Sequence, residues 1–343
     1  KKQRWRNEAV FHYALFYGKG AIFVNELNQL AASAKTILIA GHLRPDGDCC
    51  GACIASYHYL HALYPEKQIS VYLEKLPEVF EFMDKEHVII STKLPKEPVD
   101  LFLSLDCSTP DRLGAAEPFF HKAVHTACID HHISNKGYGG QNFIHAGASS
   151  TCEVLYDMMD PARIDHAIAE ALYIGIIFDS GVFRYSNTSR HTLEIAGALV
   201  EKGIPFWKYI DECFYQRSYI QTQLLGRTLL TSMRLMEGKC IVATITRRMM
   251  EFYGAKTEDI EGIIDQLRVT KGVEVAILLH EIGEQQYKVS MRSNQYIDVS
   301  RIAVYFGGGG HVKAAGCTMR GSIHDVINNI TELIDLQMQS ETE

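Results

Sequence analysis

The chain has 343 residues, 47% of them hydrophobic and 22% charged, which is typical of a globular protein large enough for two domains. The formal net charge of −7 argues against a protein that binds long nucleic acid through a basic surface, and it favours a short substrate neutralised by bound cations. The nine cysteines are odd in number and several lie in apolar stretches, which excludes a disulfide framework and favours a reducing, cytoplasmic location.

The first 34 residues are predicted to form an extension that is mainly helical, with a short amphipathic helix over 20–34. His12, Lys19 and Glu26 interrupt its apolar stretches, so we expect no signal peptide there. No apolar run approaches the ~20 residues that a membrane span requires, so we expect no contact with a membrane.

Strands and helices alternate over residues 35–200. Apolar runs rich in β-branched residues predict buried strands, and alternation with helices implies parallel pairing in a doubly wound sheet. We therefore predict an α/β domain with a mainly parallel sheet. Its expected strands are 35–40, 69–73, 99–106 and 123–129, and its expected helices are 50–63, 151–159, 165–178 and 190–202.

The pattern changes near Gly238. Much of 205–235 is predicted to be helical, so we expect a helical linker over 201–236 and a smaller α/β substrate-binding domain over 237–343. In that domain the expected strands are 240–246, 273–280 and 287–291, and the expected helices are 257–270, 299–306 and 323–338.

Acidic and imidazole side chains follow three of the predicted strands. The carboxyl ends of parallel strands open on one crevice, so these side chains should lie together. Two carboxylates as close as Asp46 and Asp48 repel each other unless a cation lies between them. A turn, a helix cap or a buried histidine would explain each motif alone, but three such strand ends favour a metal site. The residues are His42, Asp46, Asp48, Asp106, Asp130, His131 and His132.

A fourth acid, Asp179, ends an apolar helical run, where the helix dipole does not stabilise a carboxylate. A bound cation is the better explanation. Five carboxylates and three imidazoles, with no thiol counted, favour harder divalent ions over structural zinc. The number of ligands suggests two ions. We expect Mn²⁺, with Mg²⁺ or Co²⁺ as alternatives.

In their order along the chain, these motifs resemble the four motifs of the DHH phosphoesterase family. The segments GHLRPDGD, LSLDCS, IDHHISN and FDSGVFRYSNT are similar to its nanoRNase/pAp phosphatase (NrnA-type) branch, and the resemblance covers about residues 35–335. It implies that Asp130 orients an imidazole and that His132 contacts the scissile phosphate as a ligand or proton donor. The implied ligands are His42, Asp46 and Asp106 for the first ion and Asp48, Asp106, His131 and Asp179 for the second.

Four glycines precede His311 and can present backbone N–H groups to an anion, although the spacing is not that of a P-loop. A flexible turn is the alternative on the residues alone. The segment resembles the substrate-binding motif of the DHH-associated C-terminal domain. Arg184, five residues after Asp179, is either a surface cation or a phosphate contact. The implied substrate-binding residues are Gly308, Gly309, Gly310 and His311, with Arg292, Ser293 and Arg268 as further contacts.

Cys50 and Cys53 form a CxxC motif at a predicted helix start, a position that lowers the pKa of a thiol. A thioredoxin-like redox site is therefore an alternative, which we disfavour because the motif directly follows Asp48. The DHH family usually has small aliphatic or serine residues here. Three cysteines in this place, including Cys49, could make the site sensitive to oxidation.

These observations predict a two-metal phosphoesterase that acts on short nucleotides: dinucleotides such as pApA, RNAs of two to five residues, and the 3′-phosphate of pAp. Hydrolysis of cyclic di-AMP is an alternative that the sequence does not separate from these. A non-catalytic nucleotide-binding sensor is an alternative of another class, but it would not need the whole ligand set. The substrate is the expected partner, and a homodimer stays open.

Overall fold

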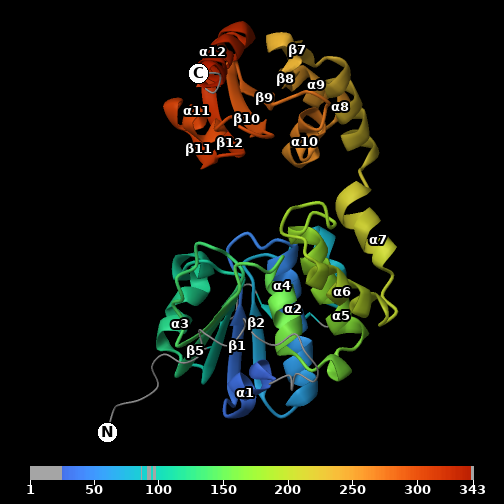
Figure 1. Cartoon of the computed structure of the whole chain (residues 1–343), viewed down its shortest axis with the longest axis vertical. Helices are drawn as coiled ribbons and strands as arrows, with labels where there is room; N and C mark the ends of the chain where they lie inside the picture. The colour runs from blue at the N-terminus through green and yellow to red at the C-terminus, as the bar shows by residue number, and fades with distance from the viewer. Residues whose placement is uncertain (1–24, 86, 91–93, 96–97, 341–343) are drawn as a thin grey trace. The chain divides into compact units, whose positions relative to one another are not determined.

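The computed structural model describes residues 25–85, 87–90, 94–95 and 98–340. The chain divides into two compact units, Lys1–Tyr215 and Gln216–Glu343, and the division falls inside the segment expected to be a linker (Figure 1). Most of the expected N-terminal extension lies outside the described residues. Among the helices that the structure describes, none combines the length and the apolar character needed to cross a membrane.

The first unit contains a six-stranded sheet with the order β3-β2-β1-β4-β5-β6, and every neighbouring pair is parallel. The prediction of a doubly wound parallel sheet is confirmed. The edge strands β3 and β6 were not predicted, because β3 has only two residues and β6 is short and only partly apolar. The strands are β1 (Thr36–Ala40), β2 (Gln68–Tyr72), β3 (Ile89–Ile90), β4 (Leu101–Leu105), β5 (His125–Asp130) and β6 (Gln141–Ile144).

Helices cover both faces of this sheet, which explains its uninterrupted apolar strands. Ile37 and Ile39 of β1 share one core with α2, α4 and α5, whereas Leu38 shares a second core with α3 (Figure 1). Gly51 lets α2 approach α5, since a Cβ atom there would lie 2.3 Å from the Ala171 carbonyl oxygen. The helices are α1 (Glu26–Ala32), α2 (Gly47–Leu63), α3 (Glu117–Lys122), α4 (Thr151–Met158), α5 (His166–Asp179), α6 (Arg190–Val200) and α7 (Phe206–Ile210).

The second unit contains a mixed six-stranded sheet with the order β11-β12-β10-β9-β8-β7, in which only β8 and β9 pair in parallel. Its helices also cover both faces: α11 and α12 share a core with Val289, and α8 and α10 share another with Leu278. The strands are β7 (Met233–Leu235), β8 (Cys240–Ile245), β9 (Val275–Gly283), β10 (Gln286–Ser293), β11 (Gly309–His311) and β12 (Ala314–Arg320), and the helices are α8 (Tyr219–Leu230), α9 (Arg247–Tyr253), α10 (Ile263–Arg268), α11 (Val299–Tyr305) and α12 (Ile323–Ser340).

One expectation for this unit was wrong, and one alternative is excluded. Met233–Leu235 was expected to be helical, but it pairs with β8, because its partner strand follows after a tight turn at Gly238. The glycine segment is not a flexible turn, since Gly309–His311 pairs with β12. A Cβ atom at Gly308 would lie 2.2 Å from the Gly316 carbonyl oxygen, so glycine permits this close approach.

Candidate metal centre

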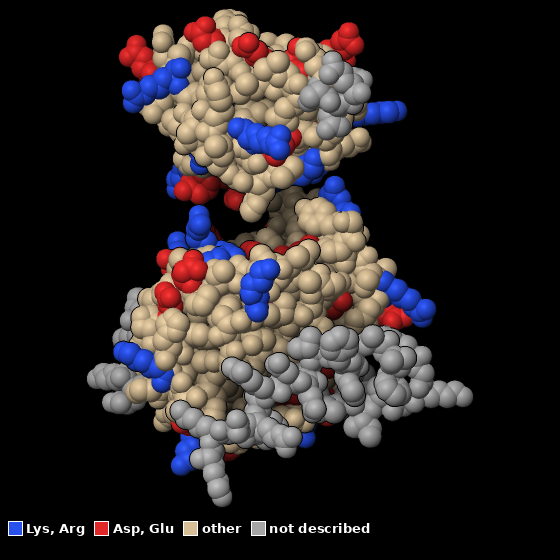
Figure 2. Space-filling view, turned by 60° about the vertical axis from the view of Figure 1, so that its left-hand side comes forward, with Lys and Arg blue, Asp and Glu red and all other residues tan. Residues whose placement is uncertain are grey.

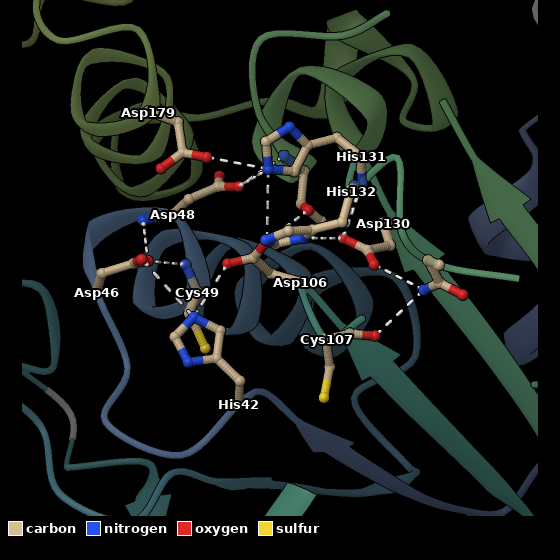
Figure 3. A network of polar contacts seen from close by, with 12 residues as sticks. His42, Asp46, Asp48, Cys49, Asp106, Cys107, Asp130, His131, His132 and Asp179 are labelled. Carbon is tan, nitrogen blue, oxygen red and sulfur yellow. Dashed lines mark hydrogen bonds and ion pairs between the residues drawn. The ribbon is translucent and has the colours of Figure 1, made fainter. Parts of the chain in front are cut away.

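The predicted site residues meet where the strand order reverses, between β1 and β4. In an open parallel sheet such a reversal leaves a crevice at the carboxyl ends of the strands. His42 follows β1, Asp106 follows β4 directly, and Asp130 ends β5 just before His131 and His132. Figure 3 shows these side chains converging. The topology therefore brings three distant motifs to one place.

A first group forms around His42. Its Nδ1 donates to the Leu43 carbonyl oxygen at 2.8 Å, which leaves Nε2 facing acids. Nε2 lies 3.4 Å from Asp106 Oδ2 and 3.7 Å from Asp46 Oδ2. Asp46 also caps α2, because its Oδ1 accepts the N–H groups of Asp48 and Cys49. Since α2 begins at Gly47, Asp46 lies at its N-cap and Asp48 in its first turn.

A second group forms around His131. Its Nε2 lies 2.9 Å from Asp179 Oδ2, 3.7 Å from Asp106 Oδ1 and 3.9 Å from Asp48 Oδ2. This nitrogen is buried and makes no hydrogen bond of acceptable geometry with any described residue. A buried polar atom normally has a hydrogen-bond partner. An imidazole nitrogen that faces three carboxylates without one fits a site for a divalent cation.

Asp106 joins the two groups, since Oδ2 faces His42 and Oδ1 faces His131. Its backbone is in the left-handed region, with φ at 52°, and its N–H donates to the Ile129 carbonyl oxygen of β5. Such a conformation costs a non-glycine residue about 1–2 kcal/mol, and it recurs at functional sites. This carboxylate therefore faces both groups.

The Asp48 carboxylate is held by the start of α4, a contact that the sequence did not predict. The N–H groups of Thr151 and Cys152, in the first turn of α4, donate to Asp48 Oδ2 at 2.6 Å and to Oδ1 at 3.0 Å. The Ser150–Glu153 spacing signals a helix start in the sequence, but it does not reveal this partner. Gly175 of α5 gives the carboxylate its space, because a Cβ atom there would lie 2.6 Å from Asp48 Oδ1.

The His132 ring is oriented by two further side chains. Its Nδ1 lies 2.7 Å from Asp130 Oδ1, and Asn135 Nδ2 donates to Asp130 Oδ2 at 2.6 Å. Burial alone would raise the pKa of Asp130, but the hydrogen bonds from His132 and Asn135 outweigh it and lower that pKa. Asn135 was not predicted, although it lies in the quoted segment IDHHISN.

Without a metal, the two groups retain protons. Burial opposes the charged form of His42, but its contacts with the Asp106 and Asp46 carboxylates outweigh it and raise the pKa of His42 to about 11. Burial likewise opposes charge on His131, but contacts with Asp179 and Asp48 raise its pKa to about 10. Burial, reinforced by repulsion from Asp106, raises the pKa of Asp48. A divalent cation would displace these protons.

The cysteines at the start of α2 are buried thiols. The Cys49 sulfur lies within 4.8 Å of ligand atoms of His42 and Asp106, which agrees with the expectation that cysteines at this helix start lie beside the site. Burial raises the pKa of Cys49 well above its ordinary value, and its contact with Cys53 adds to this. Burial also raises the pKa of Cys50 and Cys53, so the helix start does not activate the CxxC motif as a redox site would require.

Two of the expected substrate-binding residues of the second unit lie on one sheet face. Arg292 of β10 and His311 of β11 both pair with Ala314 of β12, so the three residues form one row. Asp265, which sequence reasoning missed, lies 3.8 Å from Arg292 Nε and 3.7 Å from Arg268 Nε.

The loop after β10 is organised by two buried groups. The Glu274 carboxylate, 4% exposed, accepts the N–H groups of Gln295, Tyr296 and Ile297 at 2.9–3.1 Å. Ser293 is also buried, and its Oγ donates to the Ile297 carbonyl oxygen at 2.6 Å. The Ser293 hydroxyl thus holds this loop and does not face a ligand as expected.

Arg184 lies in the segment that follows Asp179. Gly181, Val182 and Phe183 all have positive φ, and this left-handed turn ends at Arg184, whose N–H donates to the Ser180 carbonyl oxygen. The Arg184 side chain is exposed and forms no ion pair with any described residue. It is free to contact a phosphate.

The chain is similar in sequence to known protein families and to individual proteins. The model of the DHH family, N-terminal domain, matches residues 36–176, and that of the DHHA1 domain matches residues 237–340. The bifunctional oligoribonuclease and PAP phosphatase NrnA of Thermus thermophilus is 30% identical over 295 residues, which cover 85% of this chain and 86% of that protein. NrnA of Bacillus subtilis is 24% identical, with coverage of 86% and 92%.

A crystal structure of an exopolyphosphatase-related protein from Bacteroides fragilis has the same fold, with a TM-score of 0.81, 21% identity, and coverage of 94% of this chain and 98% of that one. The expected family resemblance is confirmed along most of the chain. The paired domains, the acid and imidazole cluster and the relatives agree: the chain belongs to the DHH family and is a phosphoester hydrolase.

Proposed function

We propose that this enzyme hydrolyses short nucleotides, namely dinucleotides such as pApA, RNAs of two to five residues, and the 3′-phosphate of pAp. The observation that carries the proposal is the buried His131 Nε2, which has no hydrogen-bond partner among the described residues and faces Asp48, Asp106 and Asp179. The names of the NrnA relatives, bifunctional oligoribonuclease and PAP phosphatase, support the substrate class.

Two divalent ions fit the two groups. Bound there, they would supply an activated water and offset the charge of the phosphate. The oxygen and imidazole donors favour Mn²⁺, with Mg²⁺ or Co²⁺ as alternatives. The proposed ligands are His42, Asp46 and Asp106 for the first ion and Asp48, Asp106, His131 and Asp179 for the second.

His132 is placed to contact the substrate phosphate. Its Nδ1 is held by Asp130, which leaves Nε2 for a ligand, and its side chain is 34% exposed. The hydrogen bond with Asp130 raises the pKa of His132 above its ordinary value. A protonated ring would donate a hydrogen bond to a phosphate oxygen and then its proton to the leaving oxygen.

We propose that the second unit also carries nucleotide-binding residues. Arg292 and His311 flank Ala314, and the small side chain between them leaves room for a flat group or a phosphate on that face. Figure 2 shows basic side chains scattered among acidic ones on the face in view, which agrees with a short substrate. The proposed contacts are Gly308, Gly309, Gly310, His311, Arg292 and Arg268, with Arg184 from the first unit.

A rate comparison tests the proposal. Turnover of pApA, pAp, cyclic di-AMP and a five-residue RNA would be measured with Mn²⁺ and with EDTA. Asp106→Asn should abolish turnover, whereas Asp157→Asn, a carboxylate paired with His191, should not. Fastest turnover of cyclic di-AMP would refute the proposed substrate class. Nucleotide binding without any hydrolysis in Mn²⁺ would show a sensor and refute the enzymatic proposal.

A further inference from the structure

We propose that Thr151 is a positioning residue that fixes the Asp106 carboxylate as a bridge between two metal ions. This inference rests on the two-ion site proposed above. Thr151 Oγ1 donates to Asp106 Oδ1 at 3.0 Å, and the Thr151 side chain is fully buried. Among the described residues, this is the only hydroxyl or amide hydrogen bond that the Asp106 carboxylate accepts.

The hydrogen bond determines which way each oxygen of Asp106 faces. Oδ2 lies 3.4 Å from His42 Nε2 in the first group, and Oδ1 lies 3.7 Å from His131 Nε2 in the second. A carboxylate can rotate about its Cβ–Cγ bond, so both oxygens could instead turn toward one group. The Thr151 hydroxyl opposes that rotation, and it leaves Oδ1 a second lone pair for a cation.

Thr151 is itself held in place. Its N–H donates to Asp48 Oδ2 at 2.6 Å, so a single residue contacts a ligand of the second ion and the shared ligand. Ser150 caps the same helix by accepting the N–H of Glu153. The Glu153 carboxylate in turn accepts the Thr192 hydroxyl at 2.7 Å. These buried contacts fix the start of α4, and with it the position of the hydroxyl.

Loss of the hydroxyl should therefore weaken the binding of the two ions more than it lowers the stability of the fold. Removing a side chain that orients a metal ligand typically weakens metal binding about 10–100-fold. Val keeps the size and branching of Thr and removes the donor, and Ser keeps the donor and removes the methyl group. Ser150→Ala is the matched control, because it removes a cap of the same helix that does not contact Asp106.

The test is Mn²⁺ binding by the full chain, followed by electron paramagnetic resonance. At two equivalents, wild type should show the spin-coupled signal of a bridged pair. Thr151→Val should bind the second ion about 10–100-fold more weakly and show uncoupled ions. Thr151→Ser and Ser150→Ala should keep the coupled signal. If Thr151→Val does not fold, Thr151→Ala replaces it in the comparison with Thr151→Ser.

The outcomes separate this inference from the proposed function. A wild-type protein that binds fewer than two Mn²⁺ ions would refute the two-ion site itself, and this inference with it. If Thr151→Val binds both Mn²⁺ ions with wild-type affinity and shows the wild-type coupled signal, only the role of Thr151 is refuted. Equal losses in Thr151→Val and Ser150→Ala would show a general effect of α4 and would also refute it.

Discussion

Metal binding at this site should release protons, and the apparent affinity should rise steeply with pH. In the metal-free protein, acidic neighbours raise the pKa of His42 to about 11 and that of His131 to about 10, although burial opposes both shifts. Both imidazoles are then protonated at pH 7. A cation can bind Nε2 of either ring only after the proton there has left, so each ion should displace about one imidazole proton.

The size of the effect follows from the pKa values. At pH 7, a pKa of about 10 reduces metal affinity roughly 10³-fold through proton competition, and a pKa of about 11 reduces it roughly 10⁴-fold. The affinity for each ion should therefore rise about tenfold per pH unit between pH 6.5 and 8.5.

The metal-free fold has the opposite dependence on pH. The pKa values of His42 and His131 in the folded state exceed the unfolded value of about 6.5. The stabilisation from the charged rings is therefore fully present below pH ~6.5 and is lost as pH rises through about 10 to 11. The difference in melting temperature between the Mn²⁺-loaded and EDTA-treated protein should accordingly widen as pH rises.

Isothermal titration calorimetry in two buffers with different ionisation enthalpies counts the released protons. We expect at least two for two Mn²⁺ ions at pH 7, one from each imidazole, and the same number for His191→Asn, whose ring pairs with Asp157 outside the cluster. A binding enthalpy that does not depend on the buffer, or an affinity that stays flat from pH 6.5 to 8.5, would refute the reasoning.

Three further variants test other parts of the structure. Asn135→Ala removes the 2.6 Å hydrogen bond to Asp130 and should lower kcat roughly 10–100-fold with little change in KM; steady-state kinetics with wild-type kcat would contradict this. Glu274→Gln leaves backbone N–H groups facing an amide and should lower the free energy of unfolding by about 1–3 kcal/mol in urea titration, while unchanged stability would exclude a structural role for the charge. Cys50→Ala should keep kcat within a factor of about 2, because a buried protonated thiol is not a nucleophile, and a large loss would revive the redox interpretation.

The parts of the site that follow from motif order and sheet topology could be predicted from the sequence. Motifs after β1, β4 and β5 could be placed together because parallel strands end at one edge of the sheet. The start of α2 at Gly47 was missed, since Pro45 and Gly47 are typical of a loop, so the role of Asp46 as the cap of this helix was missed too.

Contacts between distant segments could not be predicted. The N–H of Thr151 reaches Asp48 across 103 residues of sequence, and nothing in the pattern around Ser150 identifies that acceptor. The pairing of Arg292 with Asp265 is also non-local, whereas Arg268 lies three residues from Asp265 in the same helix. The strand β11 was missed because glycine has little strand propensity, and its pairing depends on the close approach of β12.

The glycine at position 175 limits how this enzyme can be made more heat-resistant. Replacing a glycine inside a helix by alanine usually gains up to ~1 kcal/mol of stability, and engineers often choose such positions first. In α5 the added methyl group would lie 2.6 Å from Asp48 Oδ1 and 2.2 Å from the Cys152 sulfur. The gain in helix propensity would come with a displaced carboxylate. A screen that measures only stability would not detect the displacement of the Asp48 carboxylate, so turnover has to be measured as well.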